Sequence, residues 1–125
     1  MRPGALAGAV TLLLVIAGCG GGSGGGTKTV SEPRGTVTVE HGRTLVLAFS
    51  TNPGVGFDWE RGTPNPDPAV LRPRGSSRDS AGLPGASSEI RYRFEARRAG
   101  TAAVGFVHFY RGKVVERRTV RVTVR

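Results

Sequence analysis

The stretch Ser-Glu-Ile-Arg-Tyr-Arg-Phe-Glu-Ala-Arg at residues 88–97 decides the fold class of this chain. Its apolar side chains stand at every second position, from Ile90 to Ala96, and polar side chains fill the positions between them. A period of two is typical of a β-strand that buries one face and exposes the other. The arginines of the polar face are expected to keep the protein soluble and to protect the sheet from edge pairing.

Similar alternation recurs on both sides of this stretch, and no window shows the 3.6-residue apolar period of a helix. Further strands are predicted at residues 36–39, 45–49, 57–60, 69–72, 104–106 and 120–124. Turn signals lie at residues 40–42, 64–68, 82–85, 98–100 and 111–112, and the proline-rich residues 63–73 are expected to form an irregular crossover. About seven short antiparallel strands in roughly 95 residues predict an all-β, immunoglobulin-like β-sandwich.

The N-terminus has the pattern of a bacterial lipoprotein signal. A short positive segment precedes an apolar run at residues 5–17, which is too short to span a bilayer, and Ile-Ala-Gly-Cys at residues 16–19 resembles a lipobox. Residues 1–18 are therefore expected to be a signal peptide and Cys19 to carry the lipid. The protein is expected to be exported and held at the cell membrane by this anchor. A soluble-secretion signal with an incidental cysteine is the alternative.

The rest of the chain divides into a linker and one domain. Residues 19–29 are mostly glycine and are expected to be a flexible linker, because they offer few side chains to pack. Residues 30–125 have the size of one small domain, expected to be a monomer. Cys19 is the only cysteine, so no intramolecular disulfide is possible and the core alone must stabilise the domain.

The charge balance favours an anionic partner. The sequence has 18 Lys and Arg against 9 Asp and Glu, a formal net charge of +9. This surplus would draw the domain toward anionic lipid, acidic cell-wall polymers or nucleic acid. The arginines are spread along the chain and do not alternate with aromatics as in a stacking platform, so no nucleic-acid partner is expected.

Residues that could support catalysis are few. His41 and His108 are the only histidines, and no serine has the Gly-x-Ser-x-Gly setting of an activated nucleophile. His41 is expected in a turn and His108 in a strand or at a hairpin rim. The sequence predicts no enzyme, no cofactor and no metal site.

A loop rich in glycine and proline, Asn-Pro-Gly-Val-Gly-Phe-Asp-Trp, occupies residues 52–59. Pro53 restricts one backbone angle, and Gly54 and Gly56 allow the positive φ angles of a tight turn. Phe57 and Trp59, two residues apart, are expected to point to one face and to anchor the base of the loop in the core. The loop is either a binding loop or an ordinary turn of a β-sandwich.

This loop resembles the Asn-Pro-Thr-Thr-Gly-aromatic-x-Trp loop of the chagasin-like inhibitors of papain-family cysteine proteases, with Gly54 and Val55 in place of the two threonines. The residues at 82–85, Gly-Leu-Pro-Gly, resemble the Gly-x-Gly-Gly loop of that family, although they also fit an ordinary glycine turn. The family's third element, Arg-Pro-Trp, is missing. The corresponding hairpin has Tyr110 and Arg111 before Gly112, and a tight Arg-Gly turn is an equally good interpretation.

The resemblance spans residues 37–124 and implies an immunoglobulin-like domain that inserts three sandwich-end loops into a protease active-site cleft. It implies a reversible inhibitor whose partner is a papain-family cysteine protease. The expected protease-binding residues are Asn52, Pro53, Gly54, Val55, Gly56, Phe57, Gly82, Leu83, Pro84, Gly85, Tyr110 and Arg111, with Trp59 as a structural anchor. The alternative is a non-inhibitory envelope lipoprotein that uses the same fold as an interaction or adhesion module.

Overall fold

The computed structural model describes residues 25–80 and 87–125. The expected signal peptide and Cys19 lie outside the described residues, as do Gly82, Leu83, Pro84 and Gly85. The elements are β2 (Thr27–Ser31), β3 (Thr36–Val39), β4 (Thr44–Thr51), a 3₁₀ turn (Pro53–Val55), β5 (Phe57–Gly62), β6 (Leu71–Ser80), β7 (Ser88–Ala96), β8 (Gly100–Tyr110) and β9 (Lys113–Val124).

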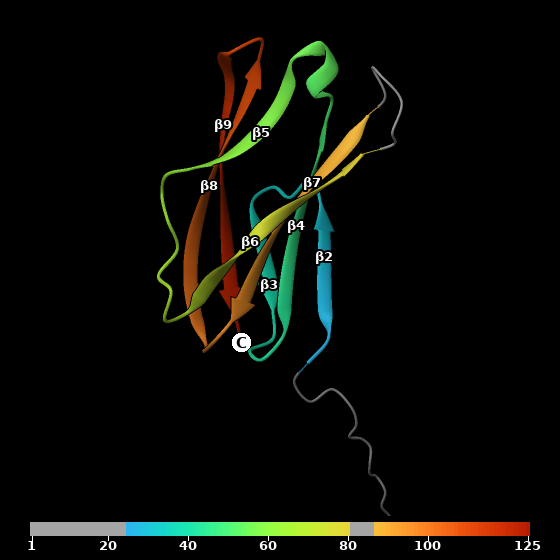
Figure 1. The fold of residues 1–125 in the computed structure, drawn as a ribbon. Coiled ribbons are helices and arrows are strands. Elements are labelled where there is room, and N and C mark those ends of the chain that lie inside the picture. The colour runs from blue at the N-terminus through green and yellow to red at the C-terminus, as the bar shows by residue number, and fades with distance from the viewer. Residues whose placement is uncertain (1–24, 81–86) are drawn as a thin grey trace, which may run out of the picture.

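The strands form two four-stranded sheets that pack face to face, as Figure 1 shows. One sheet has the order β2-β4-β7-β6 and the other has the order β3-β9-β8-β5. The prediction of an all-β sandwich is confirmed. The described residues hold eight strands where about seven were expected, since β2 begins at Thr27, inside the segment expected to be linker.

Pairing in the sheets differs from the expected all-antiparallel arrangement. β2 runs parallel to β4, and β3 runs parallel to β9. Both parallel pairs arise because the chain crosses from one sheet to the other between β2 and β3, where Pro33 is fully buried. The chain then crosses again at residues 40–43 to begin β4 beside β2.

Two further expectations are corrected. β7 lies between β4 and β6, so its arginines cannot protect a sheet edge. β6 begins at Leu71 and continues to Ser80, so the irregular crossover ends before Pro73. Pro73 is tolerated in this strand because β6 is an edge strand and its register shifts between Pro73 and Gly75.

The core lies between the sheets and takes side chains from both. Alternate residues of β4 and β7 face alternate residues of β8 and β9, as the period of two predicts. The largest fully buried side chains include Phe49, Phe94 and Phe106. Trp59 packs against Phe49 with ring centroids 4.5 Å apart. Within the described residues, no helix is long and apolar enough to cross a membrane.

Candidate functional site at one end of the sandwich

The first loop is closed by its own backbone hydrogen bonds. The carbonyl of Asn52 accepts from the N–H of Val55 at 3.1 Å and from the N–H of Phe57 at 3.0 Å, and the N–H of Asn52 donates to the carbonyl of Phe57 at 2.9 Å. Pro53 starts a single 3₁₀ turn, and Gly56 ends it with a φ of 93°. A loop whose polar backbone groups are paired internally loses little conformational freedom on binding.

The loop is also tied to the β8–β9 hairpin. The N–H of Arg111 donates to the carbonyl of Gly56 at 2.9 Å. A Cβ atom at position 56 would lie 2.9 Å from Cγ of Arg111 and 3.2 Å from its backbone nitrogen. Glycine is therefore required at this position both by its φ and by the close approach of the hairpin. Two regions expected to bind a protease are thus brought into direct contact.

The hairpin itself turns tightly. β8 ends at Tyr110 and β9 begins at Lys113, so Arg111 and Gly112 alone form the turn, with φ angles of 51° and 80°. Two consecutive positive φ angles are typical of the type I′ turn, which matches the twist of the strands. The segment therefore has the geometry of a tight Arg-Gly turn, and this geometry does not test the binding role expected of Tyr110 and Arg111.

Aromatic rings connect this end of the molecule to the core. Phe57 stacks on Tyr110 and Trp59 stacks on His108, with 4.5 Å between the ring centroids in both pairs. Trp59 is 3% exposed and is the expected anchor, whereas Phe57 is 40% exposed. The expectation that Phe57 is a core residue is therefore wrong. The two side chains share a face, but Phe57 lies beyond the end of the core.

Exposed apolar side chains lie at this end of the molecule, and Val114, which pairs with Phe109, projects from the sheet face opposite to Phe57 and Tyr110. Val55, Phe57, Val114 and Val115, with 43%, 40%, 44% and 55% exposure, are the large exposed hydrophobics of the described residues. All four belong to residues 52–57 and 109–115, which we call the loop end. One end of the sandwich thus holds all the large exposed apolar side chains of the described residues, which makes it the candidate surface for meeting another molecule.

Val114 and Val115 were not predicted as site residues. β9 shifts register opposite His108 and Phe109, so that Val114 pairs with Phe109 and Glu116 pairs with His108. Val115 is the extra residue of this bulge. The sequence signal was the adjacent pair of valines, which breaks the alternation seen elsewhere in the strand.

An open groove lies beside the first loop. Its volume is about 310 Å³, and Phe57 and His108 provide its apolar wall while Ser50 and Ser87 are among its polar residues. Thr51 at the end of β4 contacts Ser88 at the start of β7, with 2.8 Å between their hydroxyl oxygens. The start of β7, which follows the second expected loop in sequence, therefore lies at the same end as the first loop.

Charged side chains brace the base of the loop. Asp58 accepts from Nη2 of Arg78 at 2.8 Å, which joins β5 to β6, and this hydrogen bond raises the pKa of Arg78. The carboxylate of Asp58 also accepts from the N–H of Trp59 at 2.8 Å. The guanidinium of Arg111 lies over the Tyr110 ring, 5.3 Å from its centroid. The charge of Asp58 is therefore paired with that of Arg78, whereas Arg111 lies exposed in the hairpin turn with its guanidinium against the Tyr110 ring.

The described residues contain no group of three His, Cys, Asp or Glu side chains that could hold a metal ion. His108 lies within 4.0 Å of Glu116, and His41 contacts the backbone carbonyl of Arg125 through Nδ1 at 2.7 Å. His108 is in a strand and His41 in a turn, as expected. The chemistry at the loop end is that of an apolar, preorganised contact surface.

Comparison with known proteins gives structural neighbours alone. No protein-family model matches this sequence, and neither does any curated protein. The crystal structure of the cysteine protease inhibitor EhICP2 from Entamoeba histolytica is similar with a TM-score of 0.64 and 16% identity, covering 83% of this chain and 100% of that chain. The solution structure of amebosin is similar with a TM-score of 0.50 and 16% identity, covering 83% and 100% of the two chains.

A third solved structure, PbICP-C in complex with falcipain-2, is similar with a TM-score of 0.50 and 14% identity, covering 82% of this chain and 92% of that chain. EhICP2 is described as a cysteine protease inhibitor, and PbICP-C was solved bound to falcipain-2. At these identities the likeness concerns the backbone fold. The resemblance stated from the loop motifs is confirmed at that level: this chain has the fold of the chagasin-like cysteine protease inhibitors.

Proposed function

We propose that this protein is a lipid-anchored, reversible inhibitor of papain-family cysteine proteases, which it binds with its loop end. Two observations about the neighbours support the protease-inhibitor part of this proposal. EhICP2 is named as a cysteine protease inhibitor, and PbICP-C was solved in complex with falcipain-2, a papain-family cysteine protease. The loop end is the part of the chain that would enter the protease cleft.

The observation that carries the proposal is the rigid first loop with Val55 and Phe57 exposed at its surface. Four internal backbone hydrogen bonds and the bond from Arg111 to Gly56 hold the loop before any partner arrives. Burying two apolar side chains from a fixed backbone gives affinity without a large loss of entropy. No covalent step is required, so inhibition is reversible.

The contacts beside the first loop are proposed to come from the hairpin. Its two-residue turn has no room for an Arg-Pro-Trp excursion. Tyr110 and Arg111 are the expected contacts there, and we add Val114 and Val115 because both expose an apolar side chain next to the turn. The hairpin would then contact one wall of the cleft through a strand surface.

The central test is inhibition of papain by residues 25–125. We expect submicromolar inhibition, and a loss of about 30-fold or more on changing Val55→Ala and Phe57→Ala together, which is the size of a hot-spot effect. Thr101→Ala, an exposed change at the opposite end of the sandwich, is the matched control and should leave inhibition unchanged. Circular dichroism verifies that every variant is folded.

The outcome of that test also addresses the competing function. A well-folded domain that fails to inhibit papain and cathepsin L-type enzymes at high micromolar concentration contradicts the inhibitor proposal. The loop end would then serve an envelope lipoprotein as an interaction or adhesion surface. Salt-sensitive binding to cell-wall polymers would support that second function, since contacts with polyanions weaken as salt rises.

The proposed anchor is tested separately. Cys19→Ala should move the chain from the membrane fraction to the soluble fraction and remove a diacylglyceryl-sized mass from the exported protein. Inhibition by the soluble variant should equal that of residues 25–125, because Gly25, where the described residues begin, lies at the end of the sandwich opposite the loop end. A Cys19→Ala chain that stays in the membrane fraction would contradict the lipid anchor without affecting the inhibitor proposal.

A further inference from the structure

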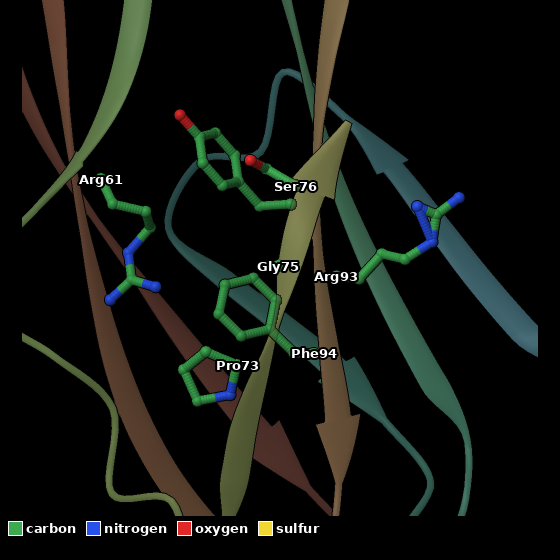
Figure 2. A pocket seen from close by; sticks show the side chains of 7 residues that line it. Arg61, Pro73, Gly75, Ser76, Arg93 and Phe94 are labelled. Carbon is green, nitrogen blue, oxygen red and sulfur yellow. The ribbon is translucent and has the colours of Figure 1, made fainter. Parts of the chain in front are cut away.

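A small cavity opens between the edge strands β5 and β6, away from the loop end. Its volume is about 130 Å³. Figure 2 shows Arg61 on one side of it, Phe94 and Pro73 at its base, and Ser76 on the opposite strand. The shift of register between Pro73 and Gly75 lies on its β6 wall. The guanidinium of Arg93 is turned away from the cavity, so Arg61 supplies its positive charge.

Arg61 is half-buried and has no anionic partner among the described residues. It belongs to none of the ion pairs formed there. Nη2 donates to the side-chain carbonyl of Asn65 at 2.9 Å, and Nε is buried with no hydrogen-bond partner in the structure. The guanidinium lies over Phe94 and Phe106, 5.6 Å and 6.0 Å from the two ring centroids. These contacts compensate only part of the hydration that the Arg61 guanidinium loses on burial.

The loss of solvation affects the pKa of the Arg61 guanidinium. Burial lowers the pKa of Arg61, and only a weaker electrostatic contribution from Tyr92 acts in the other direction. The Tyr92 hydroxyl itself donates to the carbonyl of Trp59 at 3.0 Å. A buried cation is unfavourable unless an anion and hydrogen bonds compensate it. Arg118, the buried arginine of the described residues, shows the contrast, since it is paired with Glu116 at 2.9 Å.

We propose that this cavity binds one small carboxylate or inorganic oxyanion, held by Arg61 and by the hydroxyl of Ser76. The anion would accept hydrogen bonds from Nε of Arg61 and from the guanidinium N–H groups that do not bond to Asn65. A guanidinium can bind two oxygen atoms of one anion in this way. The volume equals that of about four waters at about 30 Å³ each, enough for an ion of acetate or phosphate size. The site is independent of the proposed protease inhibition.

The test is thermal unfolding of the full chain, purified in a nonionic detergent, in acetate, phosphate, sulfate or chloride at one pH and one ionic strength. We expect the Tm to rise by several degrees with millimolar acetate or phosphate, saturating with concentration, because a ligand that binds the folded state alone stabilises it. Comparing acetate with phosphate and sulfate shows whether the cavity prefers a carboxylate or an inorganic oxyanion. Calorimetric titration of the same ions should give a millimolar or lower Kd.

Two substitutions separate a site from a general salt effect. Arg61→Gln should abolish the dependence of Tm on acetate and phosphate. Arg98→Gln, which removes an exposed arginine that forms no ion pair in the described part of the chain, should retain it in full. General effects of sulfate on stability act on all variants alike. A wild type with the same Tm in all four salts, or an Arg98→Gln variant that loses the response equally, would overturn the proposal.

If Arg61→Gln does not fold, a variant that is expected to gain stability tests the same site. Ser76→Asp places a carboxylate on the cavity wall, facing the same space as Arg61. It should raise the Tm in chloride by several degrees and remove the response to added acetate. Ser77→Asp, one residue along on the other face of β6 and opposite Arg91, should leave the response intact. A Ser76→Asp chain that is destabilised and still responds to acetate rules out the assignment.

Discussion

Gly56 connects the two parts of the loop end. It has a φ of 93°, and its carbonyl receives the N–H of Arg111. The sequence predicted that this glycine would allow a positive φ. It did not predict the contact with the hairpin, because Arg111 is far away in the sequence and its approach depends on the pairing of β5 with β8.

Gly56→Ala should therefore destabilise the domain more than a glycine change at a similar φ elsewhere. We expect a loss of about 2 kcal/mol in the free energy of unfolding, from the strained φ and from displacement of Arg111. Gly112→Ala is the control, since its φ is 80° but no atom lies within 4 Å of the added Cβ, and about 1 kcal/mol is expected. Urea unfolding measures both. Equal losses would mean that the hairpin contact contributes nothing.

Tyr92 should make the free energy of unfolding fall as the pH rises above 10. Burial raises the pKa of Tyr92 to about 12, from 10.0. Between pH 10 and 12 the unfolded chain releases this proton while the folded chain keeps it, so stability falls as pH rises through this range. The full effect approaches about 2–3 kcal/mol.

Comparison with Tyr92→Phe isolates this effect. Near pH 8 the variant should be about 1 kcal/mol less stable, because the carbonyl of Trp59 loses its hydrogen bond. Above pH 10 the difference should shrink and then reverse, since the variant lacks the titrating hydroxyl. Urea unfolding from pH 8 to 11 gives the free energy of unfolding of both proteins against pH. The contributions of the other titrating groups cancel in the difference between them. A constant difference across this range would refute the assignment.

Residue positions relative to the core were only partly predictable. The spacing of Phe57 and Trp59 placed them correctly on one face, and Trp59 is buried as expected. Phe57 is exposed because β5 extends past the end of the core, where the Tyr110 and His108 rings contact it. Alternation identifies the face of a strand but says nothing about where the opposite sheet ends.

Among the strands, β2 is the one that the sequence does not predict. Its five residues follow a glycine-rich run, and the sequence predicts Thr27, Lys28 and Thr29 as part of the linker. The strand adds to the free edge of β4 and brings Val30 against the core. Its parallel direction could not be read from alternation, which does not specify a partner. The same holds for β3 beside β9, whereas the β8–β9 hairpin was predictable from its Arg-Gly turn.

Removing β2 should weaken the whole domain. A chain that begins at residue 32 loses the pairing of residues 27–31 with β4 and exposes that edge. We expect a loss of about 2 kcal/mol, or a Tm lower by roughly 10 °C, relative to a chain that begins at residue 25. Differential scanning calorimetry measures the change. An unchanged Tm would show that the strand is peripheral to folding.

One core joins both sheets, so the domain should unfold cooperatively. Trp59 is the only tryptophan and lies in that core, so its fluorescence reports on packing between the sheets. Far-UV circular dichroism reports on the strands themselves. The two urea transitions should coincide, as in a two-state domain. Separate midpoints would indicate that one sheet or the loop end unfolds independently.

The N-terminal entry point of the domain lies at the end opposite the loop end. The N–H of Gly25 donates to the carbonyl of Gly42, in the turn beside the start of β4, and β8 runs from that end to Tyr110. Its 11 residues span about 36 Å at roughly 3.3 Å each. A domain immobilised through its N-terminus on a bead or sensor chip therefore presents the loop end outward. Amine coupling through Lys113, in contrast, would turn that end against the support.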